Sequence, residues 1–137
     1  MNANTPLPAI HPGFMWAWIA SVCLYTAASF APVGMPFLKR ALVGAVTLDV
    51  AIHFGAFLCM AFLAGLAFHA GWLLTTVTAV TLLLALASEL GQIHIPNRFF
   101  SLSDLIANIS GCLLGTVVGI ALRRLVLARD AAPAHVR

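Results

Sequence analysis

The stretch SELGQIHIPNRFFSLSDLIANISGCLLG, residues 88–115, joins two apolar runs and carries two of the four acidic residues of the chain. Glu89 ends the run before it, and Asp104 begins the run after it. Pro96, which lies between them, is typical of a turn. Ser101, followed three residues later by Asp104, is typical of a capping box at the start of a helix. The stretch therefore predicts two helices joined by a polar hinge.

The composition indicates the solvent in which the chain folds. Hydrophobic residues make up 62% of the 137 residues and charged residues only 8%, and the mean hydropathy is +1.03. A soluble domain is about half apolar and about a quarter charged. The chain is therefore predicted to be an integral membrane protein, and its length allows one compact domain. The basic residues form no stripe, so nucleic acid is not an expected partner.

Four apolar segments are long enough to cross a membrane as helices of about 20 residues. They cover residues 14–31, 46–68, 72–91 and 103–122. We therefore predict an all-α fold, an antiparallel bundle of four transmembrane helices. This membrane domain is expected to cover residues 14–124, between an N-terminal extension of residues 1–13 and a polar C-terminal tail of residues 125–137.

The number of crossings predicts where the polar residues of these helices lie. An even number puts both termini on one side of the membrane, and the first and third connections on the other. Polar residues lie near the start of the second helix, near the end of the third and near the start of the fourth. These three helix ends are on the same side of the membrane, so the polar residues share one membrane level. Spacings of three or four residues put each pair on one helical face. The predicted ligand-binding site consists of Asp49, His53, Glu89, Gln92, Arg98, Asp104 and Asn108.

A second pattern on the fourth helix predicts how this helix packs. Gly111, Gly115 and Gly119 follow Asn108 at intervals of about one helical turn. Small residues at this spacing let two helices approach closely in a membrane. The polar face of the helix is therefore also expected to be its packing face, which points into the bundle.

The ordered set of polar residues and glycines resembles the VanZ-like family of small bacterial membrane proteins. The resemblance covers residues 45–119 and rests, in chain order, on Asp49, His53, Glu89, Gln92, Arg98, Asp104, Asn108, Gly111 and Gly115. Val50 departs from the family pattern, which often has a lysine after the aspartate. The resemblance implies a role in the cell envelope, since members are associated with low-level resistance to glycopeptide antibiotics, teicoplanin more than vancomycin.

Two interpretations of the polar residues are open. In the first, the site binds or acts on an amphipathic or lipid-linked molecule, and Arg98 holds its phosphate or carboxylate. Glu89, Asp104 and His53 are then the candidates for proton transfer. In the second, the same residues form a hydrogen-bond network that only fixes the order of the helices. The chain would then be an accessory subunit of a larger membrane complex.

The remaining expectations concern cofactors, partners and orientation. No metal and no cofactor are expected, because the ligand spacing is not tight and Arg98 would oppose a cation. The expected partners are membrane lipids and, for an accessory subunit, other membrane proteins. Four arginines near the C-terminus outnumber the three basic residues of the first and third connections. This bias predicts cytoplasmic termini and a polar site at the outer face of the bacterial cytoplasmic membrane.

Overall fold

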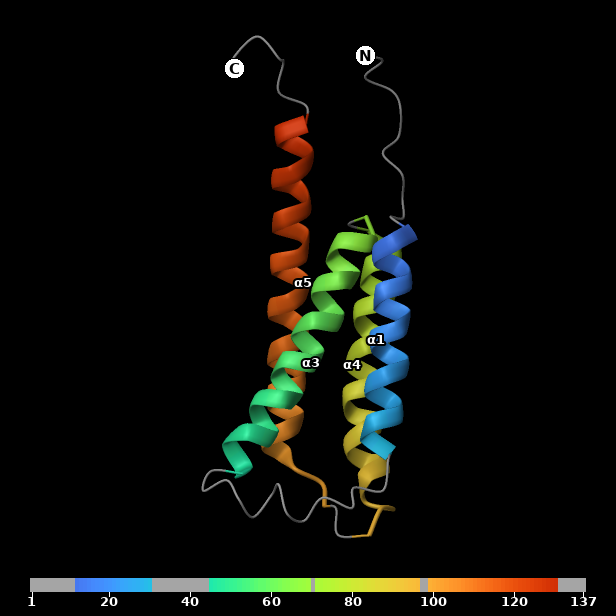
Figure 1. The fold of residues 1–137 in the computed structure, drawn as a ribbon, viewed down its shortest axis with the longest axis vertical. Helices are drawn as coiled ribbons and strands as arrows, with labels where there is room; N and C mark the ends of the chain where they lie inside the picture. The colour runs from blue at the N-terminus through green and yellow to red at the C-terminus, as the bar shows by residue number, and fades with distance from the viewer. Residues whose placement is uncertain (1–11, 31–44, 70, 97–98, 131–137) are drawn as a thin grey trace.

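The computed structural model describes residues 12–30, 45–69, 71–96 and 99–130, and these residues fold into long helices that run alternately up and down (Figure 1). The helices are α1 (Pro12–Phe30), α3 (Ala45–Ala67), α4 (Trp72–Gln92) and α5 (Leu102–Asp130). The end of the bundle where α1 and α4 end and α3 and α5 begin is called the lower end. The opposite end, where α1 begins and α3 ends, is called the upper end. The predicted all-α antiparallel bundle is confirmed.

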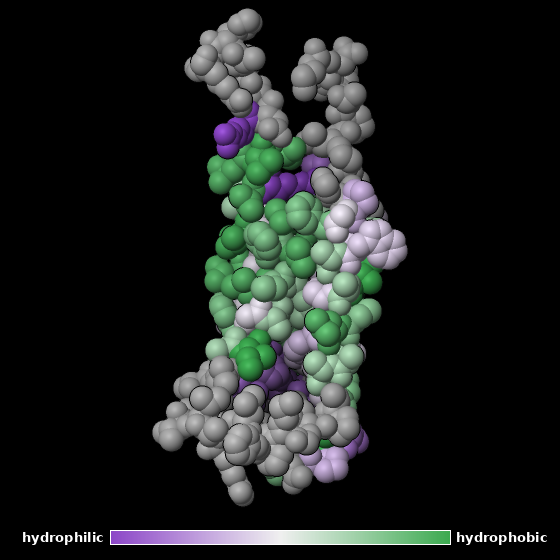
Figure 2. Space-filling model, in the orientation of Figure 1, coloured by the Kyte–Doolittle hydropathy of each residue, from purple (hydrophilic) through white to green (hydrophobic). Residues whose placement is uncertain are grey.

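All four helices are long and apolar enough to cross a membrane. Large apolar side chains also cover their outer faces, and Leu83, Val117 and Leu125 are among the most exposed of them. Figure 2 shows hydrophobic side chains over the middle of the drawn face, and hydrophilic side chains gathered toward its two ends. Such a surface is stable where lipid replaces water, because each exposed apolar side chain would otherwise order water around it.

The closest helix pair is α3 and α5, which share the most extensive contact of the bundle. The glycines of α5 make this contact possible. A Cβ atom at Gly111 would overlap the carbonyl oxygen of Phe54, and one at Gly115 would overlap that of Leu58. Gly119 continues the same face by one more turn. The two helices therefore meet backbone to backbone, as small residues spaced by four allow in membranes.

Aromatic side chains attach α1 to this pair. Tyr25 packs edge-on against Phe57, with ring centroids 4.9 Å apart, and Trp18 packs edge-on against Phe68 at 5.9 Å. Phe57 is fully buried in the core. Edge-to-face pairs of this kind contribute about 0.5–1.5 kcal/mol each beyond their buried area. Two contacts at different heights thus hold α1 against α3 along its length.

The structure differs from the sequence-based prediction at the end of α5. This helix continues to Asp130, beyond the predicted end at residue 122, so residues 125–130 belong to a helix and not to the expected tail. The reason is local, because residues 120–130 contain neither glycine nor proline and are rich in good helix formers. Arginine side chains can reach the polar membrane surface from a helix that continues through it.

Candidate functional site

The predicted site residues that the structure describes gather at the lower end of the bundle, on three helices. Glu89 and Asn108 are fully buried, and His53, Gln92 and Asp104 are buried as well. Asp49 is half-buried. Arg98, the remaining member of the predicted site, lies outside the described residues.

A directed chain of hydrogen bonds links three of these residues. The Nδ1 atom of His53 lies 3.1 Å from Oδ1 of Asn108. A carbonyl oxygen can only accept, so His53 donates from a protonated Nδ1. The amide nitrogen of Asn108 in turn donates to Oε1 of Glu89 at 3.5 Å. His53 and Glu89 are also close to each other directly, with Nδ1 and Oε1 3.6 Å apart. One asparagine thus joins α3 and α4 through α5.

Tyr25 and Ser88 extend this network, and neither residue belongs to the site predicted from the sequence. The hydroxyl of Tyr25 lies 3.4 Å from Nδ1 of His53 and 3.2 Å from Oγ of Ser88. Ser88 donates its own proton to the carbonyl oxygen of Ala85 at 2.9 Å, so it accepts from Tyr25. A signal for Tyr25 was present in the sequence. It is the single tyrosine of the chain, and the end of the first apolar segment must share the level of the site.

Ser101 and Glu89 cap the start of α5, where the sequence pattern would give Asp104 a capping role. The backbone N–H of Asp104 donates to Oγ of Ser101 at 3.3 Å, which is one half of a capping box. In the other half, the carboxylate at the third position would accept from the backbone N–H of Ser101. Here Glu89 accepts that hydrogen bond instead, through Oε2 at 3.4 Å. The carboxylate of Asp104 is therefore not used as the cap.

Asp49, His53 and Asp104 each offer one ligand-type atom within 4.8 Å of the others. Since Nδ1 of His53 donates to Asn108, Nε2 is the ring nitrogen with a lone pair. Two carboxylates and one imidazole form a donor set that divalent metal ions accept. The same three groups also accept hydrogen bonds from hydroxyls and amines. The absence of a bound metal stays a prediction from the sequence.

Gln92 lies at the same end, near the end of α4. It is buried at 4% exposure, and its Nε2 atom has no hydrogen-bond partner among the described residues. Glu89, three residues earlier on α4, is bonded to Ser101 and Asn108.

An apolar groove of ≈ 510 Å³ runs between the lower halves of α3 and α5. No pattern in the sequence predicted this groove. It is lined by Val50, Ala51, Phe54, Ser103, Ile106, Ala107 and Ser110. Three of these residues directly follow or precede Asp49, Asp104 and Asn108 in the chain. The groove and the polar cluster are therefore neighbours.

Comparison with known proteins tests the resemblance seen in the sequence. A family model described as VanZ/LLP1 matches residues 13–123. No curated protein and no solved structure matches the chain. The matched segment contains every member of the hydrogen-bond network, from Tyr25 to Asn108, and most of each helix. The chain is thus a multi-pass membrane protein that belongs to the VanZ/LLP1 family.

Proposed function

We propose that this protein binds an amphipathic or lipid-linked ligand at the lower end of the bundle. The polar head group would lie against Asp49, His53 and Asp104, and an apolar tail would lie in the groove between α3 and α5. The observation that carries the proposal is the adjacency of a polar cluster and an apolar groove along the same two helices. The arginine bias of the sequence suggests that this end faces outward from the bacterial cytoplasmic membrane.

The proposal divides the polar residues into two groups. Asn108, Ser88 and Tyr25 use their polar atoms for contacts between helices, so they act as scaffold. Asp104 is relieved of its capping role by Glu89, and His53 keeps one ring nitrogen outside the chain of hydrogen bonds. These two residues lie beside Asp49 in the cluster that the head group of the ligand would contact. A cluster that served only as scaffold would have no reason to relieve Asp104.

The chemistry of the cluster favours a particular kind of head group. Carboxylates and a neutral imidazole nitrogen accept hydrogen bonds, whereas hydroxyls and amines donate them. Sugar hydroxyls or amino groups therefore suit Asp49, His53 and Asp104 better than a bare phosphate does. His53, with its proton held on Nδ1, carries a lone pair on Nε2 that could also take a proton from a ligand hydroxyl. An acylated glycopeptide or a lipid-linked sugar has this combination of head group and tail.

Direct binding of teicoplanin, a glycopeptide with an acyl chain, tests the proposal. The purified chain in mild detergent is titrated with teicoplanin and with vancomycin, which has no acyl chain, and binding is followed by native mass spectrometry. We expect teicoplanin to bind more tightly, and Asp104→Asn to weaken it while the melting temperature is unchanged. Asp130→Asn, the same chemical change at the far end of α5, is the matched control.

The groove is tested separately by filling it. Ala51 is exposed and lines the groove, so Ala51→Trp is expected to weaken teicoplanin binding without unfolding the protein. Ala121→Trp, at an exposed position of α5 outside the groove, should have no effect. The proposal fails if Asp104→Asn lowers the melting temperature and leaves binding intact. Stoichiometric co-migration of the endogenous protein with a large complex would instead favour an accessory subunit.

A further inference from the structure

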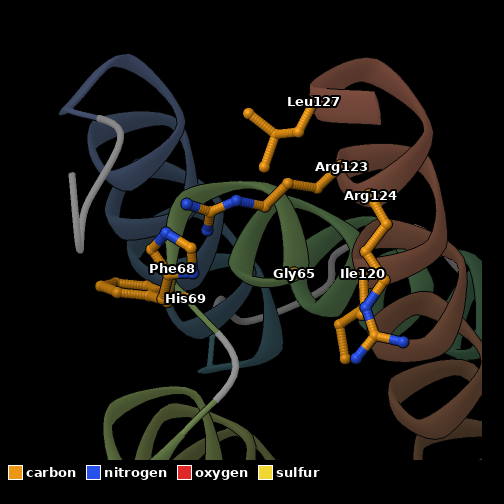
Figure 3. A pocket seen from close by; sticks show the side chains of 7 residues that line it. All are labelled: Gly65, Phe68, His69, Ile120, Arg123, Arg124 and Leu127. Atoms are coloured by element: carbon orange, nitrogen blue, oxygen red, sulfur yellow. The ribbon is translucent and has the colours of Figure 1, made fainter. Parts of the chain in front are cut away.

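At the upper end of the bundle, far from the proposed ligand site, α3 and α5 separate and leave a cavity of ≈ 230 Å³. The separation begins above a close backbone contact between the two helices. A Cβ atom at Gly65 would lie 2.9 Å from the Cα atom of Gly119, so the two backbones touch there. Above this contact the cavity is lined by Gly65, Phe68, His69, Ile120, Arg123, Arg124 and Leu127 (Figure 3).

The charged side chains that line this cavity are two arginines, and both are positive. Figure 3 shows the Arg123 side chain extending from α5 across the cavity to His69, while Arg124 points away on the side of Ile120. The Nε2 atom of His69 is buried and has no hydrogen-bond partner among the described residues. No carboxylate is present among the described residues that line the cavity. The guanidinium group of Arg123 beside the ring of His69, with a second arginine among the lining residues, is complementary to an anion, and phosphate suits the planar guanidinium best.

The position of the cavity relative to the membrane indicates the source of this anion. Trp72 starts α4 at the same end and is 79% exposed, as tryptophans at the head-group level of a membrane are. Arginine at this level contacts the phosphate groups of lipids. The other wall residues, Phe68, Ile120 and Leu127, are apolar and suit the glycerol and upper acyl region of a lipid.

The floor of the cavity limits how the lipid can bind. Because Gly65 and Gly119 are in backbone contact, no acyl chain can pass downward between α3 and α5 at this point. The acyl chains must remain in the bilayer, against the exposed apolar side chains of Val117 and Leu125. We propose that the cavity is a binding site for the phosphate group of an anionic phospholipid. This site is independent of the ligand site proposed at the lower end.

Native mass spectrometry of the full chain, released from mixed phosphatidylglycerol and phosphatidylcholine vesicles, tests the site. We expect one phosphatidylglycerol molecule to stay bound in preference to phosphatidylcholine. Arg123→Gln should lower its retention about fivefold, the effect of one arginine at a membrane surface. Arg129→Gln is the matched control, because Arg129 is an exposed arginine on the same helix that does not line the cavity. It should leave retention unchanged.

A second variant keeps the test valid if Arg123→Gln fails to fold. Leu127→Trp fills the cavity without changing any charge, and it should lower phosphatidylglycerol retention to a similar extent. Equal loss in the Arg123 and Arg129 variants would overturn the proposal, because it would show unspecific attraction to the basic end of α5. Unchanged retention in Leu127→Trp would also overturn it. Displacement of the lipid by millimolar inorganic phosphate would show that free phosphate, and not the lipid, is the occupant.

Discussion

The Nδ1 atom of His53 lies 3.1 Å from Oδ1 of Asn108, although the two residues are 55 positions apart in the chain. This contact sets the direction of the whole network, because an amide group accepts at one atom and donates at the other. Asn108 accepts from His53 and donates to Glu89. A carboxylate in its place could not donate, and a leucine could do neither. The relationship makes Asn108 the residue on which the arrangement of α3, α4 and α5 depends.

Replacing Asn108 should therefore destabilise the bundle. Asn108→Leu keeps a similar volume but removes one partner each from the buried side chains of His53 and Glu89. Leaving buried polar groups unpaired costs about 1–3 kcal/mol each. We expect a lower melting temperature in detergent, followed by tryptophan fluorescence. Ser110→Ala, at an exposed position of the same helix, should melt like the unchanged protein. Equal melting of both variants would contradict the network.

The role of Tyr25 can be divided between its hydroxyl and its ring. Tyr25→Phe removes the hydrogen bond to Ser88 and the longer contact with Nδ1 of His53, but keeps the edge-on contact with Phe57. We expect a loss of about 0.5–1.5 kcal/mol, as for one buried hydrogen bond. Tyr25→Ala also removes the ring and should cost clearly more. If the two variants have the same unfolding midpoint in a denaturant titration, the ring does not attach α1.

The packing of α5 on α3 predicts opposite outcomes for two glycine substitutions. Gly115→Ala brings a methyl group into the backbone of Leu58, which cannot move aside as a side chain could. Overpacking of this kind costs about 1–3 kcal/mol. A Cβ atom at Gly55 meets nothing within 4 Å, so Gly55→Ala should instead stabilise α3 by about 0.5–1 kcal/mol. If both variants raise the melting temperature, or both lower it, the close contact between Gly115 and the backbone of Leu58 is absent.

Metal chelation tests whether the cluster of Asp49, His53 and Asp104 holds an ion. The sequence predicts no bound metal ion, because Arg98 lies in the connection between α4 and α5 and its positive charge would oppose a cation. We therefore expect EDTA to leave the melting temperature unchanged, and the purified protein to contain no stoichiometric metal by elemental analysis. A bound metal that EDTA removes, with a fall in melting temperature, would contradict this expectation. His53→Gln should then abolish metal retention.

The sequence by itself determined the helical fold and the membrane environment. Both depend on local properties, since an apolar run of about 20 residues needs internal hydrogen bonds in lipid wherever it lies in the bundle. The number of crossings also predicts the level at which Glu89 and Asp104 lie, because chain direction alternates from helix to helix. The end of α5 was predicted too early, at residue 122, because the charged residues that follow the apolar run do not interrupt the helix.

Only the tertiary structure decided which atoms pair at the lower end, and which cavities remain between the helices. Periodicity places His53 and Asn108 on faces of their own helices, but the rotation of each helix about its axis depends on how its neighbours pack. The contact of Gly115 with the backbone of Leu58 sets this rotation for α3 and α5. Glu89 accepts from Ser101, and Asp104 does not, because the end of α4 lies beside the start of α5. Such choices depend on distances of a few ångström between residues far apart in the chain, which spacing along one helix cannot specify.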